Sequence, residues 1–279
     1  KDEDPMCIDE AALARVDPAV ELGRKHGLHV CLNFHRGPGY SVSGEREEPF
    51  DLWKDPEALD AFCLHWETFA RRYRGVSPEE LSFNLINEPP GPADDGMTRE
   101  DHERVMRRAV QTVRAVDPTR PVVVDGVAWG NEPCPELADL DVVQSTRAYQ
   151  PFRLTHYEAT WVDSKGWPEP DWPYTGSPDY RWGRAELEKH YRPWGELVRR
   201  GVAVHCGEGG AFHKTPRDVV LRWLDDVLSI LTGHGIGFGD IAEAQREVGS
   251  GIPMFCIGGI KTGNLAEVMA RRITRGVTD

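Results

Sequence analysis

The sequence predicts a (β/α)8 TIM barrel, and three observations support that prediction. The chain of 279 residues has the length of one ordinary barrel domain. Short apolar segments alternate along it with longer segments that carry apolar residues at helical spacing, which is typical of a parallel sheet covered by helices. We count eight strand-like segments, the number that closes such a barrel.

Each expected strand is a short apolar run that ends at a polar or glycine-containing turn. The expected strands are 28–34, 81–86, 121–126, 141–145, 202–206, 235–238, 252–258 and 272–277. The helices expected between them are 9–26, 56–74, 97–116, 183–200, 216–232, 240–248 and 264–271. The segment 146–182 is long, rich in Trp and Pro, and follows a strand, so we expect it on the face of the barrel that carries the active site.

The stretch FNLINEPP (83–90) shows how a strand ends at a chemically useful residue. Its apolar residues suit a strand buried on both faces. Asn87 and Glu88 follow where the strand should end, and two prolines prevent its continuation. A carboxyl group at this position serves either as a buried ion-pair partner or as a catalytic group.

Composition excludes several classes of protein. The chain is 39% hydrophobic and 28% charged, as is ordinary for a globular protein, and its net charge of −13 argues against a nucleic-acid binder. It contains no apolar run of about 18 residues, so we expect no membrane-spanning helix. The six cysteines stand singly without a CxxC pair, which favours reduced thiols and no metal centre. We expect a monomer without cofactor. The start KDEDPM has neither an initiator Met nor a signal peptide, so the sequence does not indicate where the protein resides.

Side chains at the carboxyl ends of successive strands converge on one face of a barrel. These positions hold His35, Asn87, Glu88, Tyr149 and Glu208. Two carboxyl groups on two strand ends match the needs of a retaining glycosidase, in which one acid protonates the leaving oxygen and the other attacks the anomeric carbon across ~5–5.5 Å. An inverting enzyme needs ~6.5–9.5 Å between them, which a sequence does not measure.

Four motifs in order resemble glycoside hydrolase family 5, the cellulase and mannanase family, over about residues 5–238. They are LNFHRGPGY (32–40), NEP (87–89), YQPFRLTHYEATWV (149–162) and HCGEGGAFHKTP (205–216). The resemblance implies a retaining hydrolase of β-linked glucan or mannan, with oligo- or polysaccharide as its partner.

Carried to the matching positions, the resemblance makes Glu88 the general acid/base and Glu208 the nucleophile. Asn87 would donate to the sugar 2-hydroxyl, Tyr149 would hydrogen-bond Glu208, and His35 would line the subsite of the cleaved sugar.

Other candidates stay open between binding and structural roles. His156 either reaches substrate or is structural, and Trp161 either stacks on sugar or anchors its loop. Arg36 would contact sugar or form an ion pair, and His205 is expected to be packed behind the site. Four other acidic residues, Asp94–Asp95, Asp125 and Glu132, are expected in solvated turns.

The chain departs from the family pattern in three places. Arg147 stands where the family has a His two residues before the tyrosine, and the family's first two strands and the Trp after its last strand are missing. The tail GIPMFCIGGIKTGNLAEVMA (251–270) instead resembles thiamine-phosphate-synthase-type barrels.

These departures suggest a division into 1–238 and 239–279. We hypothesise that the tail strands close the barrel in permuted, chimeric order. Arg275 would then take the place of the family's catalytic-site arginine, which is missing together with the family's second strand. The alternatives are a truncated or mis-joined sequence, a sugar-binding barrel with little turnover, and a phosphate-binding barrel with its site at Gly258–Gly259.

Overall fold

The computed structural model describes residues 6–42 and 50–238. Within them the chain forms two compact units, one ending at Ser145 and the other beginning at Thr146, and each is described by itself. The strands and helices expected after residue 238 lie outside the described residues, as do Gly258–Gly259 and Arg275.

The first unit is built on parallel strands, as the sequence predicts. Val30 lies opposite Leu81 in one parallel pair of strands, and Phe83 lies opposite Val122 in the neighbouring pair. Six strands form one sheet in the order β1-β4-β5-β6-β9-β10, and β6 runs from the first unit into the second. The strands of the first unit are β1 (Val30–Asn33), β4 (Leu81–Asn84), β5 (Val122–Asp125) and the first half of β6 (Val143–Ala148).

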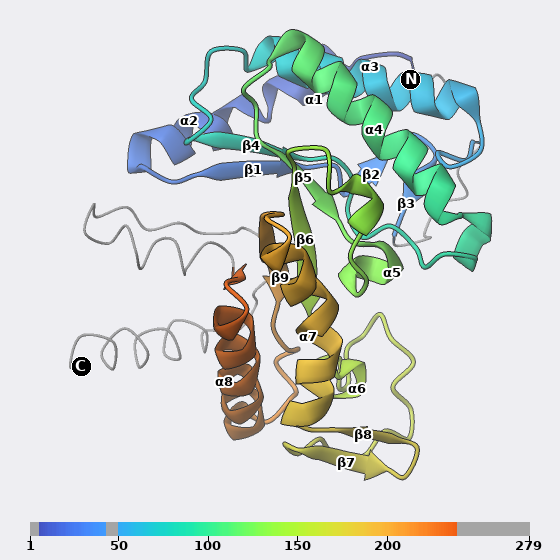
Figure 1. Ribbon diagram of the computed structural model, residues 1–279, viewed down its shortest axis with the longest axis vertical. Coiled ribbons are helices and arrows are strands. Elements are labelled where there is room, and N and C mark those ends of the chain that lie inside the picture. The colour runs from blue at the N-terminus through green and yellow to red at the C-terminus, as the bar shows by residue number, and fades with distance from the viewer. Residues whose placement is uncertain (1–5, 43–49, 239–279) are drawn as a thin grey trace. The chain divides into compact units, whose positions relative to one another are not determined.

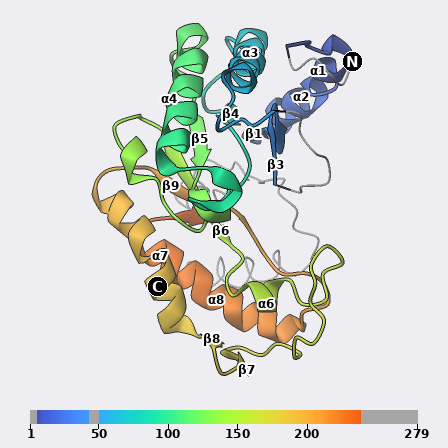
Figure 2. The same cartoon turned by 90° about the vertical axis from the view of Figure 1, so that its right-hand side faces the viewer.

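The helices of the first unit lie against this part of the sheet, with α3 and α4 side by side (Figures 1 and 2). They are α1 (Glu10–Ala14), α2 (Asp17–His26), α3 (Pro56–Arg72) and α4 (Arg99–Val116). The expected helix 9–26 is divided into α1 and α2 because Pro18, near the start of α2, cannot donate the hydrogen bond that would continue the ladder. Helix α4 begins with a capping box between Thr98 and Asp101.

Aromatic side chains fill the core between the helices and β4. The ring of Trp66 stacks on Phe34 with centroids 4.2 Å apart and lies 5.1 Å from Phe83. Its indole N–H donates to the carbonyl of Leu85 at 3.1 Å, so this large buried ring leaves no unsatisfied donor. The core therefore fixes the chain just before Asn87 and Glu88.

Short elements connect these strands and helices. They are β2 (Arg36–Gly37), β3 (Tyr40–Ser41), the 3-10 turns η1 (Asp94–Gly96) and η2 (Pro135–Leu137), and the turn α5 (Val127–Gly130).

The second unit contains the rest of β6 and the strands and helices that follow it. Strand β10 pairs in parallel with β9, with Gly237 opposite His205, and α7 lies beside α8 (Figure 1). The elements are α6 (Phe152–Thr155), β7 (Tyr174–Ser177), β8 (Tyr180–Trp182), α7 (Arg184–Arg199), β9 (Val204–Gly209), α8 (Arg217–Gly233) and β10 (Gly237–Phe238).

Gly209 permits close packing around the end of β9. A β-carbon at this position would lie 2.6 Å from the β-carbon of Ala148 and 2.8 Å from the ring of Phe238. Both distances are shorter than van der Waals contact, so any side chain here would push β6 or β10 away. Glycine at this position therefore allows the backbone next to Glu208 to pack closely against Ala148 and Phe238.

The segment 146–182 contains a hairpin that the sequence did not predict. Strands β7 and β8 pair antiparallel, and the guanidinium of Arg153 lies 4.8 Å from the ring centroid of Tyr180 and 5.8 Å from that of Trp167. Cation–aromatic packing of this kind stabilises the hairpin where the alternation of apolar and polar residues is weak. Among the residues described, none of the helices is both long enough and apolar enough to span a membrane.

Arg120 is the buried cation on which the first unit's stability should depend most. Its side chain is 1% exposed and pairs with Asp117 at 2.8 Å, while the guanidinium also donates to the carbonyls of Leu81 (2.7 Å) and Val76 (2.8 Å). Replacing Arg120 by Met leaves the Asp117 charge and these carbonyls without their partner.

We expect Arg120→Met to lower the free energy of unfolding by roughly 3–5 kcal/mol, because breaking a buried pair leaves an uncompensated charge. Urea unfolding followed by circular dichroism would measure it. Arg71→Ala, which removes an exposed pair with Glu67, should cost less than about 1 kcal/mol. Equal losses in the two variants would contradict this assignment.

Candidate active site

In the first unit, Glu88 lies a few residues after the end of β4 and is partly buried. The neighbouring Asn87 is fully buried, and its backbone N–H donates to the carbonyl of Phe34 at 2.9 Å. The side-chain amide of Asn87 donates to Oε2 of Glu88 at 3.4 Å. The two predicted residues are therefore in contact, and the end of β1 fixes Asn87.

The backbone of Glu88 is held in an unusual conformation. Its φ of 49° lies in the left-handed region, which is costly for a residue with a side chain. The N–H of Glu88 donates to Oδ2 of Asp125 at 3.0 Å, and the hydroxyl of Tyr40 donates to its carbonyl at 2.5 Å. Both ends of this residue are thus tied to side chains from other elements.

The expectation that Asp125 lies in a solvated turn is wrong. Its side chain is fully buried at the end of β5, where Oδ1 accepts a hydrogen bond from Nδ2 of Asn84 at 2.8 Å. The segment VVVDG looks like a turn signal, but its acid follows a buried parallel strand as Glu88 does. Its place at the end of an apolar run, like that of Glu88, is the sequence pattern that could have predicted the burial of Asp125. Glu132, by contrast, is exposed and pairs with Arg99 at 2.5 Å.

In the second unit, Glu208 lies on β9 with its side chain 21% exposed. The hydroxyl of Tyr149 donates to Oε2 of Glu208 at 3.1 Å, which is the contact that the resemblance implies. Nη2 of Arg147 lies 3.5 Å from Oε1. Each carboxylate oxygen therefore has its own partner.

Arg147 brings a permanent positive charge to Glu208. Its side chain is 2% exposed, and its carbonyl accepts from the hydroxyl of Tyr191 at 3.2 Å. Arginine stays protonated in proteins, so its guanidinium places a positive charge beside the carboxyl group. Arg147 departs from the family pattern. Its contact with Glu208 shows that this departure places a positive charge next to that side chain.

Aromatic rings continue from Tyr149 toward the surface. The ring of His156 stacks on Phe152 at 3.9 Å and meets the rings of Tyr149 and Trp161 edge-on at 5.4 and 6.2 Å. Burial lowers the pKa of His156 to about 4, so its imidazole is neutral near neutral pH. Trp161 is 63% exposed and offers a ring to solvent.

Phe212 belongs to this aromatic group although sequence reasoning did not single it out. Its ring meets that of Trp161 edge-on at 5.1 Å, and its N–H donates to the carbonyl of Thr155 at 2.7 Å. The hydroxyl of Thr155 in turn donates to the carbonyl of Tyr149 at 2.6 Å. Hydrogen bonds thus join the loop after Glu208 to the loop after β6.

The first unit also presents an aromatic side chain that the sequence reasoning did not select. Trp129 is 44% exposed and has a φ of 57°, in the left-handed region. The backbone N–H of Trp129 donates to the carbonyl of Pro89 at 2.8 Å. The backbone N–H of Ala128 donates to the carbonyl of Pro90 at 3.0 Å. This strained turn is fastened to the residues that follow Glu88. The predicted His35 is exposed in the bend after β1.

One group of side chains has the composition of a metal site. The ligand atoms of His102, Cys134 and Glu136 lie within 4.8 Å of one another, and Nδ1 of His102 is 3.9 Å from the Cys134 sulfur. Burial raises the pKa of the Cys134 thiol to about 12, and Arg99 already donates to Glu136 at 3.3 Å. A protonated thiol and a competing guanidinium suit a buried polar contact better than a metal.

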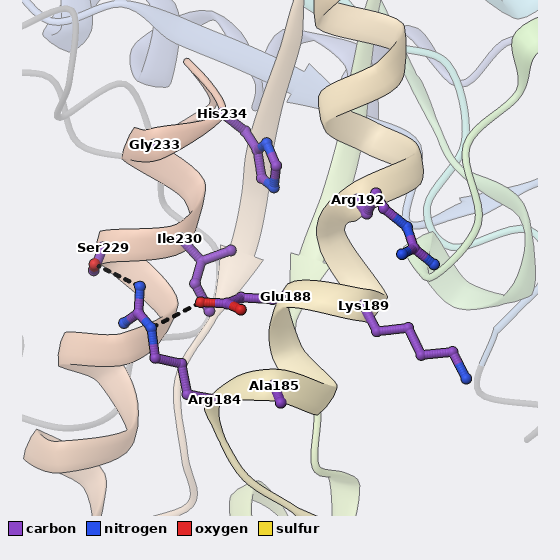
Figure 3. A pocket seen from close by; sticks show the side chains of 9 residues that line it. All are labelled: Arg184, Ala185, Glu188, Lys189, Arg192, Ser229, Ile230, Gly233 and His234. Carbon is purple, nitrogen blue, oxygen red and sulfur yellow. Dashed lines mark hydrogen bonds and ion pairs between the residues drawn. The ribbon is translucent and has the colours of Figure 1, made fainter.

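A pocket of about 500 Å³ lies between α7 and α8, and none of the predicted site residues lines it (Figure 3). Arg184 in this pocket bonds Glu188 at 2.8 Å and Ser229 at 3.2 Å, while Lys189 and Arg192 point away from His234. Its cations do not converge on one point. This pocket therefore does not contain the predicted site residues.

The parallel strands and the acidic side chains near the ends of β4, β5 and β9 agree with the predicted TIM-barrel fold. The family model described as "Cellulase (glycosyl hydrolase family 5)" matches residues 1–238, and the chain belongs to that family. The matched region ends before the tail, so the resemblance of the tail to thiamine-phosphate-synthase-type barrels is not supported, and the permuted closure stays a prediction.

Relatives agree with this family. Cellodextrinase A of Ruminococcus flavefaciens is 28% identical over 242 residues, covering 82% of this chain and 67% of its own length. Endoglucanase C of Acetivibrio thermocellus is 26% identical over 253 residues, covering 82% and 71%.

A solved structure described as a glycoside hydrolase is 43% identical with a TM-score of 0.82, covering 85% of this chain and 72% of its own. The endoglucanase Cel5A of Thermotoga maritima, solved with mannotriose, shares the fold at 23% identity and a TM-score of 0.66, covering 84% and 72%.

The lowered pKa of His156 predicts a loss of stability in acid. The unfolded chain binds this proton near pH 6.5 and the folded chain only near pH 4, so stability is complete above about 6.5 and is lost as the pH falls toward about 4. His156→Gln should flatten part of this slope when urea midpoints are compared from pH 4 to 7. Leu154→Val, a nearby buried change without a titratable group, should keep the slope; identical slopes in wild type and His156→Gln would contradict the prediction.

Proposed function

We propose that this chain is a retaining β-glycosidase that cleaves β-linked glucan, or the related mannan, by double displacement. The observation that carries the proposal is the pair of partners on Glu208, a cation at one oxygen and a phenol at the other. Such partners hold both oxygens of the carboxylate in place, and a nucleophile must be oriented toward the carbon that it attacks. Membership of a cellulase family supports the substrate class.

In the first step, an oxygen of Glu208 attacks the anomeric carbon while Glu88 gives its proton to the glycosidic oxygen, and the bond to the leaving sugar breaks. This leaves a glycosyl ester on Glu208. In the second step, Glu88 takes a proton from water, the water oxygen attacks the same carbon, and the ester bond to Glu208 breaks. Both carboxyl groups must act on one glycosidic bond, and a retaining mechanism requires ~5–5.5 Å between two such groups.

We assign substrate contacts to the remaining predicted residues. Asn87 donates to the sugar 2-hydroxyl, His35 lines the subsite of the cleaved sugar, and His156, neutral at working pH, offers a hydrogen bond from its ring. The exposed indoles of Trp161 and Trp129 suit the apolar faces of sugar rings. Two exposed platforms favour an extended chain as substrate, and therefore endo-action on glucan.

Azide rescue tests the two carboxyl roles separately. Glu208→Ala should lose turnover of an activated aryl β-cellobioside, and azide should restore it with an α-glycosyl azide as product. Glu88→Ala should lose about 10²–10⁴-fold on unactivated substrate, and azide should give the β-glycosyl azide.

Glu100→Ala, an exposed acid in the first turn of α4, serves as the control and should keep wild-type rates. No turnover by a cooperatively folded wild type would favour the sugar-binding alternative. Rescue of Glu208→Ala with β-configured product would overturn its role as nucleophile.

Trp161→Ala should reduce kcat/KM about 3–10-fold on cello-oligosaccharides, which corresponds to about 1 kcal/mol of lost stacking. The effect should appear mainly in KM, because an exposed platform binds ground state and transition state alike. Leu22→Ala, at another exposed apolar residue, should leave both constants unchanged. An unchanged KM for Trp161→Ala would remove this residue from the binding surface.

A further inference from the structure

Asp125 has contacts that connect it to the chemistry proposed for Glu88. The carboxylate is fully buried, and both of its oxygens accept hydrogen bonds. Oδ2 accepts from the backbone N–H of Glu88 at 3.0 Å, and Oδ1 accepts from the side-chain amide of Asn84 at 2.8 Å. Burying a charge costs free energy even when it is hydrogen-bonded, so we looked for a role that this carboxylate serves at the end of β5.

The backbone conformation of Glu88 indicates that role. A φ of 49° costs a residue with a side chain about 1–3 kcal/mol and persists only where neighbouring groups enforce it. Asp125 binds the N–H of Glu88 and Tyr40 binds its carbonyl, so the residue is held at both ends. Because φ and ψ set the direction of the Cα–Cβ bond, these bonds also aim the Glu88 carboxyl group.

We propose that Asp125 is a positioning residue that holds Glu88 in the left-handed conformation required for proton transfer to the glycosidic oxygen. The inference rests on the acid/base role proposed for Glu88. A hydrogen bond from an N–H to a carboxylate is about twice as strong as one to a neutral acceptor, which suits a bond that must offset backbone strain. Asp125 acts through Glu88 and does not itself touch the substrate.

Asn84 makes a conservative test possible. Its Oδ1 is buried and accepts no hydrogen bond from the described part of the chain. In Asp125→Asn, the new amide oxygen can still accept from the N–H of Glu88. The new amide nitrogen can then donate to Oδ1 of Asn84 once the Asn84 amide flips, so the geometry survives without the charge.

Leaving-group dependence distinguishes positioning from simple stabilisation. Departure of phenol needs a proton from Glu88, whereas departure of 2,4-dinitrophenol does not. We therefore expect Asp125→Ala to reduce kcat/KM for phenyl β-cellobioside about 10²-fold. The same variant should keep kcat/KM for dinitrophenyl β-cellobioside within about 3-fold, and Asp125→Asn should restore most of the loss on the phenyl substrate.

Two reference variants complete the experiment. Asp117→Asn weakens the buried pair with Arg120 in the same unit and should affect both substrates equally, if at all. Glu88→Ala should show the strongest leaving-group dependence. If Glu88→Ala shows none, the acid/base role itself fails; if Glu88→Ala is selective and Asp125→Ala lowers both rates equally, the inference about Asp125 is overturned.

Tyr40→Phe provides a second route should Asp125→Ala fail to fold. It removes the hydrogen bond at the carbonyl of Glu88 and leaves the ring in the core. The same selectivity, at smaller size, would support the positioning of Glu88 by its backbone. If Tyr40→Phe lowers both rates equally while Glu88→Ala is selective, the inference is refuted.

Discussion

The register between β4 and β5 is the constraint on which the chemistry of the first unit depends. Asn84 lies opposite Val123, and the N–H of Leu85 donates to the carbonyl of Val123 at 3.1 Å. This pairing brings the ends of the two strands level, so that Asp125 reaches the backbone of Glu88. A slip of one residue would turn each side chain of a strand to the opposite face and separate these groups.

In the second unit, Glu208 is held in place by two side chains from one strand. Arg147 and Tyr149 are two residues apart where β6 ends, so the alternation of a strand directs both side chains to one face. Glu208 therefore receives a cation and a phenol from a single strand end. Glu88, by contrast, is fixed through its backbone by groups from two different elements. Glu88 is held by its main chain and Glu208 by its carboxylate.

The sequence predicted the repeating pattern better than the local exceptions to it. The described parallel strands and long helices fall where periodicity placed them, because burial of an apolar face leaves a regular trace in a sequence. Asp125 was misjudged because an acid before a glycine is also a common turn signal. The left-handed conformation of Glu88 and the β7–β8 hairpin depend on contacts with distant residues such as Tyr40 and Arg153, which no local pattern records.

Gly209 has a consequence for anyone who wishes to reshape the specificity of this enzyme. A methyl group there would collide with Ala148 and Phe238, so the position next to Glu208 is closed to diversification. Further along the loop, the ring of Phe212 meets that of Trp161, which is exposed. Combinatorial libraries on this scaffold should therefore leave Gly209 fixed and randomise Phe212 together with Trp161, whose rings touch each other.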